Sequence, residues 1–251
     1  MANSPEAIML SNLDAVEKIE DEFIRDLEKT LRKLQLRLTK YIKDKATDTQ
    51  IADTALAASD LQGILEDTGF YRLGTDYLSD SYQRILDTAL DYYARTYDVD
   101  LRYTDISRSH LEALRELDFR KFNSIASDVV DELARGVIDL QFGAAEFNDI
   151  VGRIASVSDD TARYAETWVR TATSAAHRTA TEALGRELGI ERYRYYGPED
   201  GATREFCRDH IDEIKTLDEW QNTMNDDGQS AAIYGGGYNC RHRLVPVGPM
   251  K

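Results

Sequence analysis

Cysteine is scarce in this sequence, because 251 residues contain only two, Cys207 and Cys240. Two cysteines exclude the disulfide framework of a small secreted domain and make a reducing compartment the default. Long apolar runs are also missing, since no stretch of about 18 or more apolar residues occurs. The first ten residues, MANSPEAIML, lack the basic start and apolar stretch of a signal peptide. We therefore expect a soluble protein with no targeting signal and no membrane partner.

Positive charge is in short supply as well. The chain has 31 Lys and Arg against 46 Asp and Glu, a formal net charge of −15, and residues 51–190 alone carry 14 basic and 25 acidic groups. An acidic field repels phosphate and keeps a chain soluble. This excludes wholesale wrapping of DNA and leaves room only for a local basic contact.

Most of the chain has the apolar spacing of amphipathic helices. Residues 11–46 carry an apolar residue every three or four positions, including Leu27, Leu31 and Leu34. Such a stripe favours a bundle helix packed within its own chain, and the alternative is a helix that packs on another protein, with these three leucines as partner-interaction residues. The spacing predicts further helices over 48–66, 76–96, 107–140 with a break near Phe119, 144–155, and 159–188, the last opened by Ser158 and Asp159. Residues 98–105 are expected to be a connector or short strand.

After Gly189 the pattern changes. It predicts a strand over 192–196, a Gly-Pro turn, a short helix over 203–213, a capping box at 216–219 that opens a second helix, and a closing strand in RHRLVPV. The expected fold is mainly α, with an elongated helical N-terminal region followed by a small α+β C-terminal module. We divide it into residues 1–158, a connecting helix over 159–190, and the module over 191–251.

Both cysteines have a histidine close behind them, in REFCRDHID and NCRHRLVP. On a helix Cys207 and His210 share a face, and on a strand Cys240 and His242 do so too. Two thiolates and two imidazoles suit a closed, structural zinc site, and the glycines at 235–237 would let the second pair swing into place. Two readings stay open beside it: two unrelated buried thiols, and a Cys207–Cys240 disulfide that leaves both histidines unexplained.

Four arginines flank these pairs, and they have two interpretations. They contact phosphate or an acidic partner, or they pair with Glu205, Asp209, Asp212 and Glu213 nearby, which we favour. The four are Arg204, Arg208, Arg241 and Arg243. No nucleophile elbow, Walker loop or G-x-G-x-x-G motif is present.

The order of elements is specific. A helix containing WVRTATSAAHRTATEALGRELGI leads to YRYYGPEDGATREFCRDHID and then to NCRHRLVP. Over residues 160–247 this resembles the C-terminal region of the phage Mu F-type head morphogenesis family, the minor head proteins. Arg170 and Thr171 match the family's Arg-Thr pair. Cys207 with His210 and Cys240 with His242 match its two metal-like pairs.

The resemblance implies a structural virion component without enzymatic activity, present in a few copies per head. Its partners would be the portal protein or the major capsid protein, with local contact to packaged DNA. It would act in head assembly and in DNA packaging or ejection. It would be found in the host cytoplasm during assembly and then in the capsid interior or at the portal vertex. The helical N-terminal part would bind the portal or capsid, and zinc would be structural. The alternatives are a metal-dependent nuclease or toxin-like enzyme, and a cellular zinc-stapled adaptor.

Overall fold

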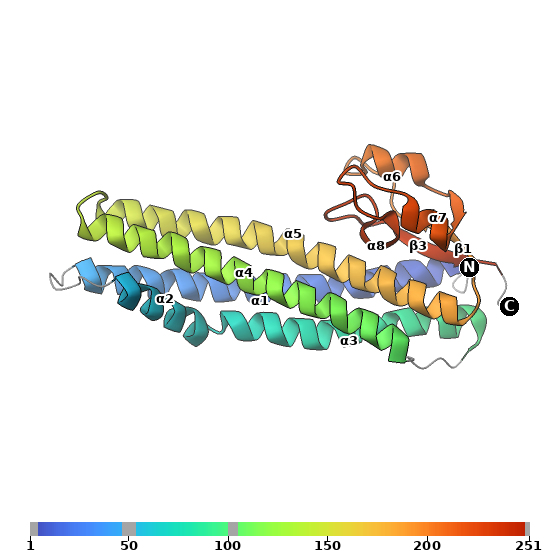
Figure 1. The fold of residues 1–251 in the computed structure, drawn as a ribbon, viewed down its shortest axis with the longest axis horizontal. Coiled ribbons are helices and arrows are strands. Elements are labelled where there is room, and N and C mark those ends of the chain that lie inside the picture. The colour runs from blue at the N-terminus through green and yellow to red at the C-terminus, as the bar shows by residue number, and fades with distance from the viewer. Residues whose placement is uncertain (1–4, 47–53, 100–104, 249–251) are drawn as a thin grey trace. The chain divides into compact units, whose positions relative to one another are not determined.

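The computed structural model describes residues 5–46, 54–99 and 105–248. Five long helices come first along the chain (Figure 1): α1 (Pro5–Ala46), α2 (Thr54–Thr68), α3 (Phe70–Tyr97), α4 (Asp105–Gln141) and α5 (Phe147–Glu187). A small part with three strands follows: β1 (Arg192–Tyr196), α6 (Glu205–His210), β2 (Ile214–Thr216), α7 (Leu217–Asn222), α8 (Ala231–Tyr234) and β3 (Arg243–Val247). The predicted fold class, a long helical region followed by a small α+β module, is confirmed.

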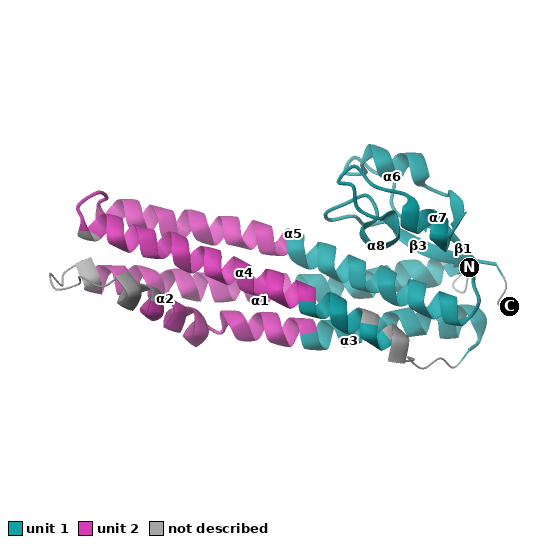
Figure 2. Ribbon diagram, in the orientation of Figure 1, with its two compact units in different colours: residues 1–21, 79–116, 167–251 teal, residues 22–78, 117–166 magenta. Residues whose placement is uncertain are grey.

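The chain forms two compact units that share four of the long helices (Figure 2). Unit 1 contains Met1–Asp21, Ser79–Glu116 and Thr167–Lys251, and unit 2 contains Glu22–Leu78 and Leu117–Glu166. Helices α1, α3, α4 and α5 each contribute one segment to each unit. None of the described helices is long and apolar enough to cross a membrane.

Unit 2 is held by helix packing around aromatic rings. Phe122 of α4 stacks on Phe70 with ring centroids 4.9 Å apart, and Phe23 of α1 lies 4.0 Å from the ring of Tyr77. Gly74 permits this arrangement, because a Cβ there would lie 2.2 Å from the Phe122 ring. Apolar residues of α1 complete the core: Leu27, Leu31, Leu34, Leu38 and Ile42.

Unit 1 contains the sheet, which has the order β2-β1-β3 with both pairings antiparallel. Central β1 places Tyr193 opposite Pro246 and Tyr195 opposite Leu244. Because side chains alternate along a strand, Tyr193 and Tyr195 share one face, and both are fully buried. The predicted strand at 192–196 is confirmed. So is the capping box, in which Thr216 accepts the Glu219 N–H and Glu219 reaches back to the Thr216 N–H.

The sequence predicted two helix breaks that the structure does not have. A break was expected near Phe119 and between 155 and 159, yet α4 and α5 run through both places. Ser158 and Asp159 favour helix starts, but Asp159 is exposed and Ser158 half-buried, so their side chains need not compete with the helix backbone. Of the connector expected over 98–105, the structure describes only Asp98, Val99 and Asp105. Of the helix expected over 48–66, it describes residues 54–66, and residues 48–53 lie outside the described ranges.

Candidate metal centre

Three of the four predicted donors meet in unit 1. Cys207 lies on α6, while Cys240 and His242 lie just before β3. The two Sγ atoms are 3.8 Å apart, and the Cys240 Sγ is 3.9 Å from the His242 Nδ1. All three side chains are buried, with exposed fractions of 2, 3 and 2%. A disulfide needs an S–S distance of about 2 Å, so both cysteines are free thiols and the disulfide alternative is not formed.

The spacing of the donors fits a tetrahedral ion. Metal–sulfur bonds of about 2.3 Å at tetrahedral angles separate two sulfurs by about 3.8 Å, which is the distance between Cys207 and Cys240. The corresponding sulfur–nitrogen distance is about 3.6 Å, slightly shorter than the 3.9 Å between Cys240 and His242. All three donor atoms lie within 4.8 Å of one another, so the three residues can converge on one metal ion.

The glycine run allows close approach to the sulfurs instead of acting as a flexible arm. A Cβ on Gly236 would lie 2.4 Å from the Cys207 Sγ, and one on Gly235 would lie 2.7 Å from the Cys240 Sγ. The Gly236 N–H donates to the Cys240 Sγ at 3.1 Å. Gly235 has a φ of 56°, a backbone conformation that disfavours side chains. The backbone thus packs against both thiols and supplies a donor to one of them.

A buried arginine from α5 holds the loop that carries two donors. Arg178, only 3% exposed, donates to the His242 carbonyl through Nε at 3.0 Å and Nη2 at 2.7 Å. It also donates to the carbonyls of Cys240 at 2.9 Å and Ile233 at 2.9 Å. Arg178 therefore fixes the backbone on which Cys240 and His242 stand.

A second buried arginine, Arg243, contacts the same backbone. Its Nη1 donates to the carbonyls of Cys240 and His242, both at 3.0 Å, and its Nη2 donates to the Ser174 hydroxyl at 2.9 Å. Burial, and then the charge of Arg178, lowers the pKa of Arg243 to about 10. Arg243 therefore stays charged at neutral pH, and positive charge next to a thiol favours the thiolate that binds a metal.

The two thiols titrate as a pair. The hydrogen bond from Cys207 lowers the pKa of Cys240, with further lowering by His242 and Arg178. The same hydrogen bond raises the pKa of Cys207, and burial adds to the rise. The surroundings therefore favour ionisation of Cys240 over that of Cys207. A bound ion would displace the proton of Cys207 as well.

His210 is not a member of this donor group. Its Nδ1 lies 2.8 Å from the Phe206 carbonyl and its Nε2 lies 3.8 Å from the Glu213 carboxylate. Its ring stacks on that of Phe206, with centroids 4.3 Å apart. Although i and i+3 share a helical face, this short helix directs the second side chain to its own backbone.

The predicted Arg-Thr pair has contacts inside unit 1. Arg170 pairs with Glu20 at 3.2 Å and Asp21 at 3.4 Å, both on α1. The Thr171 hydroxyl accepts the backbone N–H of Asn239, next to Cys240, at 3.1 Å. Arg170 and Thr171 therefore link α5 to α1 and to the loop that carries Cys240 and His242.

The three predicted contact leucines are core residues of unit 2. The exposed fractions of Leu27, Leu31 and Leu34 are 1, 4 and 1%. These leucines therefore pack within their own chain, as the bundle-helix interpretation of 11–46 expects, because almost none of their surface is exposed to a partner.

The favoured reading of the four arginines near the cysteines was wrong. Only Arg241 pairs with an acid, and that acid is Asp200, at 2.6 and 2.8 Å. The others donate to carbonyls: Arg204 to Gly236 and Tyr238, Arg208 to Thr203, and Arg243 to the donor loop. Loop carbonyls lack the backbone partners that helices and strands provide, so the guanidiniums supply them.

Sequence reasoning did not identify Arg178 or Tyr195. Arg178 stands in AAHRTA, within the helix expected over 159–188. A charged residue flanked by alanines on a buried face was the available signal. For Tyr195, which lies 3.4 and 3.5 Å from the two sulfurs, the strand pattern predicts burial and nothing more.

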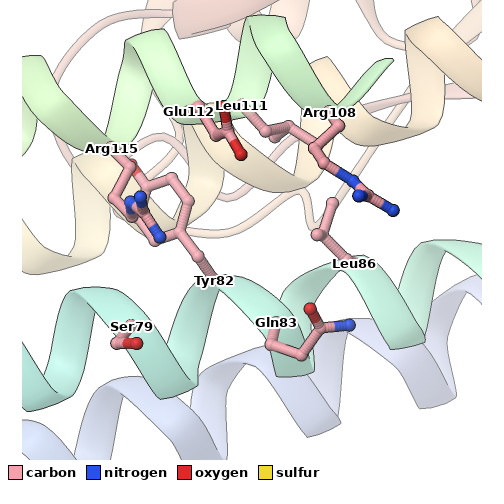
Figure 3. A pocket seen from close by; sticks show the side chains of 8 residues that line it. All are labelled: Ser79, Tyr82, Gln83, Leu86, Arg108, Leu111, Glu112 and Arg115. Carbon is pink, nitrogen blue, oxygen red and sulfur yellow. The ribbon is translucent and has the colours of Figure 1, made fainter. Parts of the chain in front are cut away.

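A separate pocket in unit 1 lies between α3 and α4 (Figure 3). Arg108, Glu112 and Arg115 of α4 line one side, and Ser79 and Gln83 of α3 line the other. Charges of both signs alternate along it, and it lacks the Cys and His donors that meet at Cys207. It therefore offers no comparable chemistry.

No family model, curated protein or solved structure matches this chain. The fold and site define its class on their own: a mainly helical protein whose small C-terminal part contains a three-stranded sheet and a buried donor set of two thiols and one imidazole, on α6 and on the segment before β3.

Proposed function

We propose that this chain is a phage minor head protein of the Mu F type. It docks on the portal or the inner capsid and acts in head assembly, and its C-terminal module is held together by one structural zinc ion. It works as a structural protein in a few copies per head.

The order and placement of the C-terminal elements carry the proposal. The resemblance consists of a helix with an Arg-Thr pair, a strand, a Cys-bearing short helix and an Asn-Cys-Arg segment before a strand. In unit 1 these are α5, β1, α6 and the residues before β3, and three of their Cys and His side chains lie together. Thr171 of the pair contacts Asn239. Elements far apart in the sequence thus serve one site, which supports the resemblance.

The burial of the donors supports a structural zinc. Cysteine thiolates and imidazole select zinc among common divalent ions. A catalytic zinc needs a position open to substrate, and none of the three donors is more than 3% exposed. The net charge of −15 also suits a protein that contacts other proteins beside packaged DNA.

One observation favours a second candidate, a metal-dependent nuclease. Three converging donors instead of four match the number that catalytic zinc sites use. A nuclease assay with added divalent metal separates the two functions. Cleavage that disappears in His242→Ala while the helical fold remains would favour the enzyme.

The proposal is tested with the portal protein of the same genome. We expect a portal gene directly upstream of this one. Co-expression of the two full-length proteins should give a complex that elutes with the portal ring and carries a few copies of this chain. A chain that elutes alone, zinc-loaded and monomeric, beside an intact portal ring would contradict the proposal.

A further inference from the structure

Tyr195 lies beside the three donors and is held there on several sides. Its ring is fully buried, stacked between His242, with centroids 5.2 Å apart and an interplanar angle of 5°, and Trp220, at 5.3 Å. The ring of Phe206 meets it edge-on at 6.3 Å. The Trp220 indole N–H donates in turn to the Tyr193 carbonyl at 2.9 Å, so the stack is anchored to β1. The tyrosine hydroxyl therefore has a fixed place.

That place is next to both sulfurs. The Tyr195 Oη lies 3.4 Å from the Cys207 Sγ and 3.5 Å from the Cys240 Sγ. Both of its hydrogen-bond contacts are to sulfur, which is a weak acceptor as a thiol. A buried tyrosine hydroxyl usually finds a hydrogen-bond partner, and the partners of this one are the sulfurs of two candidate metal donors.

The two oxygen–sulfur distances match those of a fourth ligand beside the two sulfurs of a tetrahedral site. A metal–sulfur bond of about 2.3 Å and a metal–oxygen bond of about 2.0 Å at the tetrahedral angle place sulfur and oxygen about 3.5 Å apart. The two oxygen–sulfur distances are 3.4 and 3.5 Å, and the sulfur–sulfur distance of 3.8 Å satisfies the same geometry. We propose that Tyr195 binds the metal through its phenolate oxygen, and that Cys207, Cys240, His242 and Tyr195 together form a closed site.

The surroundings of Tyr195 act on this ligand set in opposite directions. Burial, and then the charge of Cys240, raises the pKa of Tyr195, while the charge of Arg178 lowers it, so the phenolate would form only against a bound dication. Two thiolates, one phenolate and a neutral imidazole around a dication leave one negative charge, and the buried guanidiniums of Arg178 and Arg243 lie against the same loop. Hydrogen bonds from such groups to ligand-bearing backbone fix ligands in orientation. His210, in contrast, has its Nδ1 on the Phe206 carbonyl. Tyr195 thus occupies the position that the sequence assigned to His210.

The inference rests on the metal site of the proposed function, and cobalt-substituted full-length protein tests it. Tyr195→Phe removes the oxygen and keeps the ring stack, and His210→Gln is the matched control. Each protein is titrated with azide while the visible absorption of Co²⁺ is recorded. We expect the wild type and His210→Gln to give a four-coordinate spectrum that azide leaves unchanged. In Tyr195→Phe azide should shift the bands, and zinc affinity should fall about 10–100-fold.

Two results would overturn the assignment. A wild-type spectrum that responds to azide means that solvent holds the fourth position, and a response in His210→Gln alone means that His210 holds it. If Tyr195→Phe does not fold, the ultraviolet absorption of the wild type still tests the ligand. Removal of zinc by a chelator must abolish the ultraviolet absorption of one phenolate per bound zinc, and no such change would refute the ligand.

These failures are distinguishable from failure of the proposed function. A wild type that binds neither cobalt nor zinc would remove the metal site altogether. A bound metal with a different fourth ligand would leave the zinc-held module standing, and portal binding is measured independently of both.

Discussion

The buried side chains of α5 change character between its two ends. In unit 2 the helix buries Ile150, Ile154, Thr161 and Ala165, one residue at every turn or so. In unit 1 every residue from 172 to 178 is buried, including four polar ones: Thr173, Ser174, His177 and Arg178.

The same contrast holds for the units as wholes. The buried polar side chains of unit 2 within the described residues are two threonines, Thr68 and Thr161, while all the buried charged and histidine side chains belong to unit 1. Apolar periodicity is therefore sufficient to build unit 2. Unit 1 depends on specific polar partners, because a buried charge or thiolate without one is costly.

Loss of a metal donor should have the largest effect. Metal binding contributes about 10–16 kcal/mol in zinc-finger peptides, and Cys240→Ala removes one thiolate and the acceptor of the Gly236 N–H. We expect it to lose the metal and to expose residues 191–251 to protease, while the unit 2 segments resist cleavage. Mass spectrometry of the fragments measures this. A chelator added to the wild type should give the same cleavage pattern. Cleavage spread evenly over both units would contradict the proposed dependence of unit 1, but not unit 2, on the metal.

Loss of the buried Arg178 guanidinium should have the second-largest effect. Arg178→Met keeps much of the volume but removes the guanidinium from the Ile233 carbonyl and leaves the Cys240 and His242 carbonyls with Arg243 alone, at a cost of about 3–5 kcal/mol in the free energy of unfolding. Arg241→Met is the matched control, because its ion pair with Asp200 is half exposed and is screened by solvent, so its loss should change stability little. Denaturant unfolding gives the free energy of unfolding of both variants. Equal losses would show that burial of the Arg178 guanidinium does not matter for stability.

Unit 2 should respond to volume and not to polar chemistry. Gly74→Ala places a methyl group 2.2 Å from the Phe122 ring, and overpacking costs about 1–3 kcal/mol. Gly63→Ala, in a helix with nothing within 4 Å, should instead stabilise by up to about 1 kcal/mol. Thermal unfolding gives both signs, and metal content should equal that of the wild type in both. A Gly74→Ala variant as stable as Gly63→Ala would refute the close packing.

The smallest effect is a pH dependence that originates in unit 1. Burial raises the pKa of Glu20 to about 7, against the lowering by Arg243 and Arg170. Because the folded pKa exceeds the unfolded value of 4.5, the stabilising contribution is complete below that value and is lost as the pH rises through 7. Glu20→Gln should therefore be more stable than the wild type at pH 8 by about 1–2 kcal/mol and similar to it at pH 4.5.

His177 opposes this dependence and must be separated from it. Burial, with Arg243 and Arg178, lowers the pKa of His177 to about 3, so its stabilising contribution is complete above the unfolded value of 6.5 and is lost as the pH falls toward 3. The difference between Glu20→Gln and wild type cancels the His177 contribution, because both proteins contain it. A difference that does not change between pH 4.5 and 8 would mean that Glu20 ionises normally.

Sequence reasoning succeeded where one local rule decides the structure. The stripe with Leu27, Leu31 and Leu34, the strand at 192–196 and the Thr216–Glu219 box each follow from spacing within a few residues. It failed where the partner is distant in sequence. Arg178 acts on carbonyls 55 to 64 residues away, and no local pattern encodes that contact.

The donor set illustrates the same boundary. The expected pairing of Cys240 with His242 is found, although both residues precede β3 instead of lying on it. The same reasoning on α6 paired Cys207 with His210, whose Nδ1 lies on the Phe206 carbonyl. Tyr195 reaches the sulfurs only because β1 pairs with β3 and aligns Tyr195 with Leu244. Pairing between strands about 50 residues apart is fixed by the whole unit and not by the strand.

We propose that a metal ion bound by Cys207, Cys240 and His242 holds the C-terminal module together. Elemental analysis of the purified full-length protein measures its zinc, and titration without denaturant measures its reactive thiols. We expect about one zinc per chain and thiols that react only after a chelator is added. No stoichiometric metal, with a module that stays folded, would contradict it.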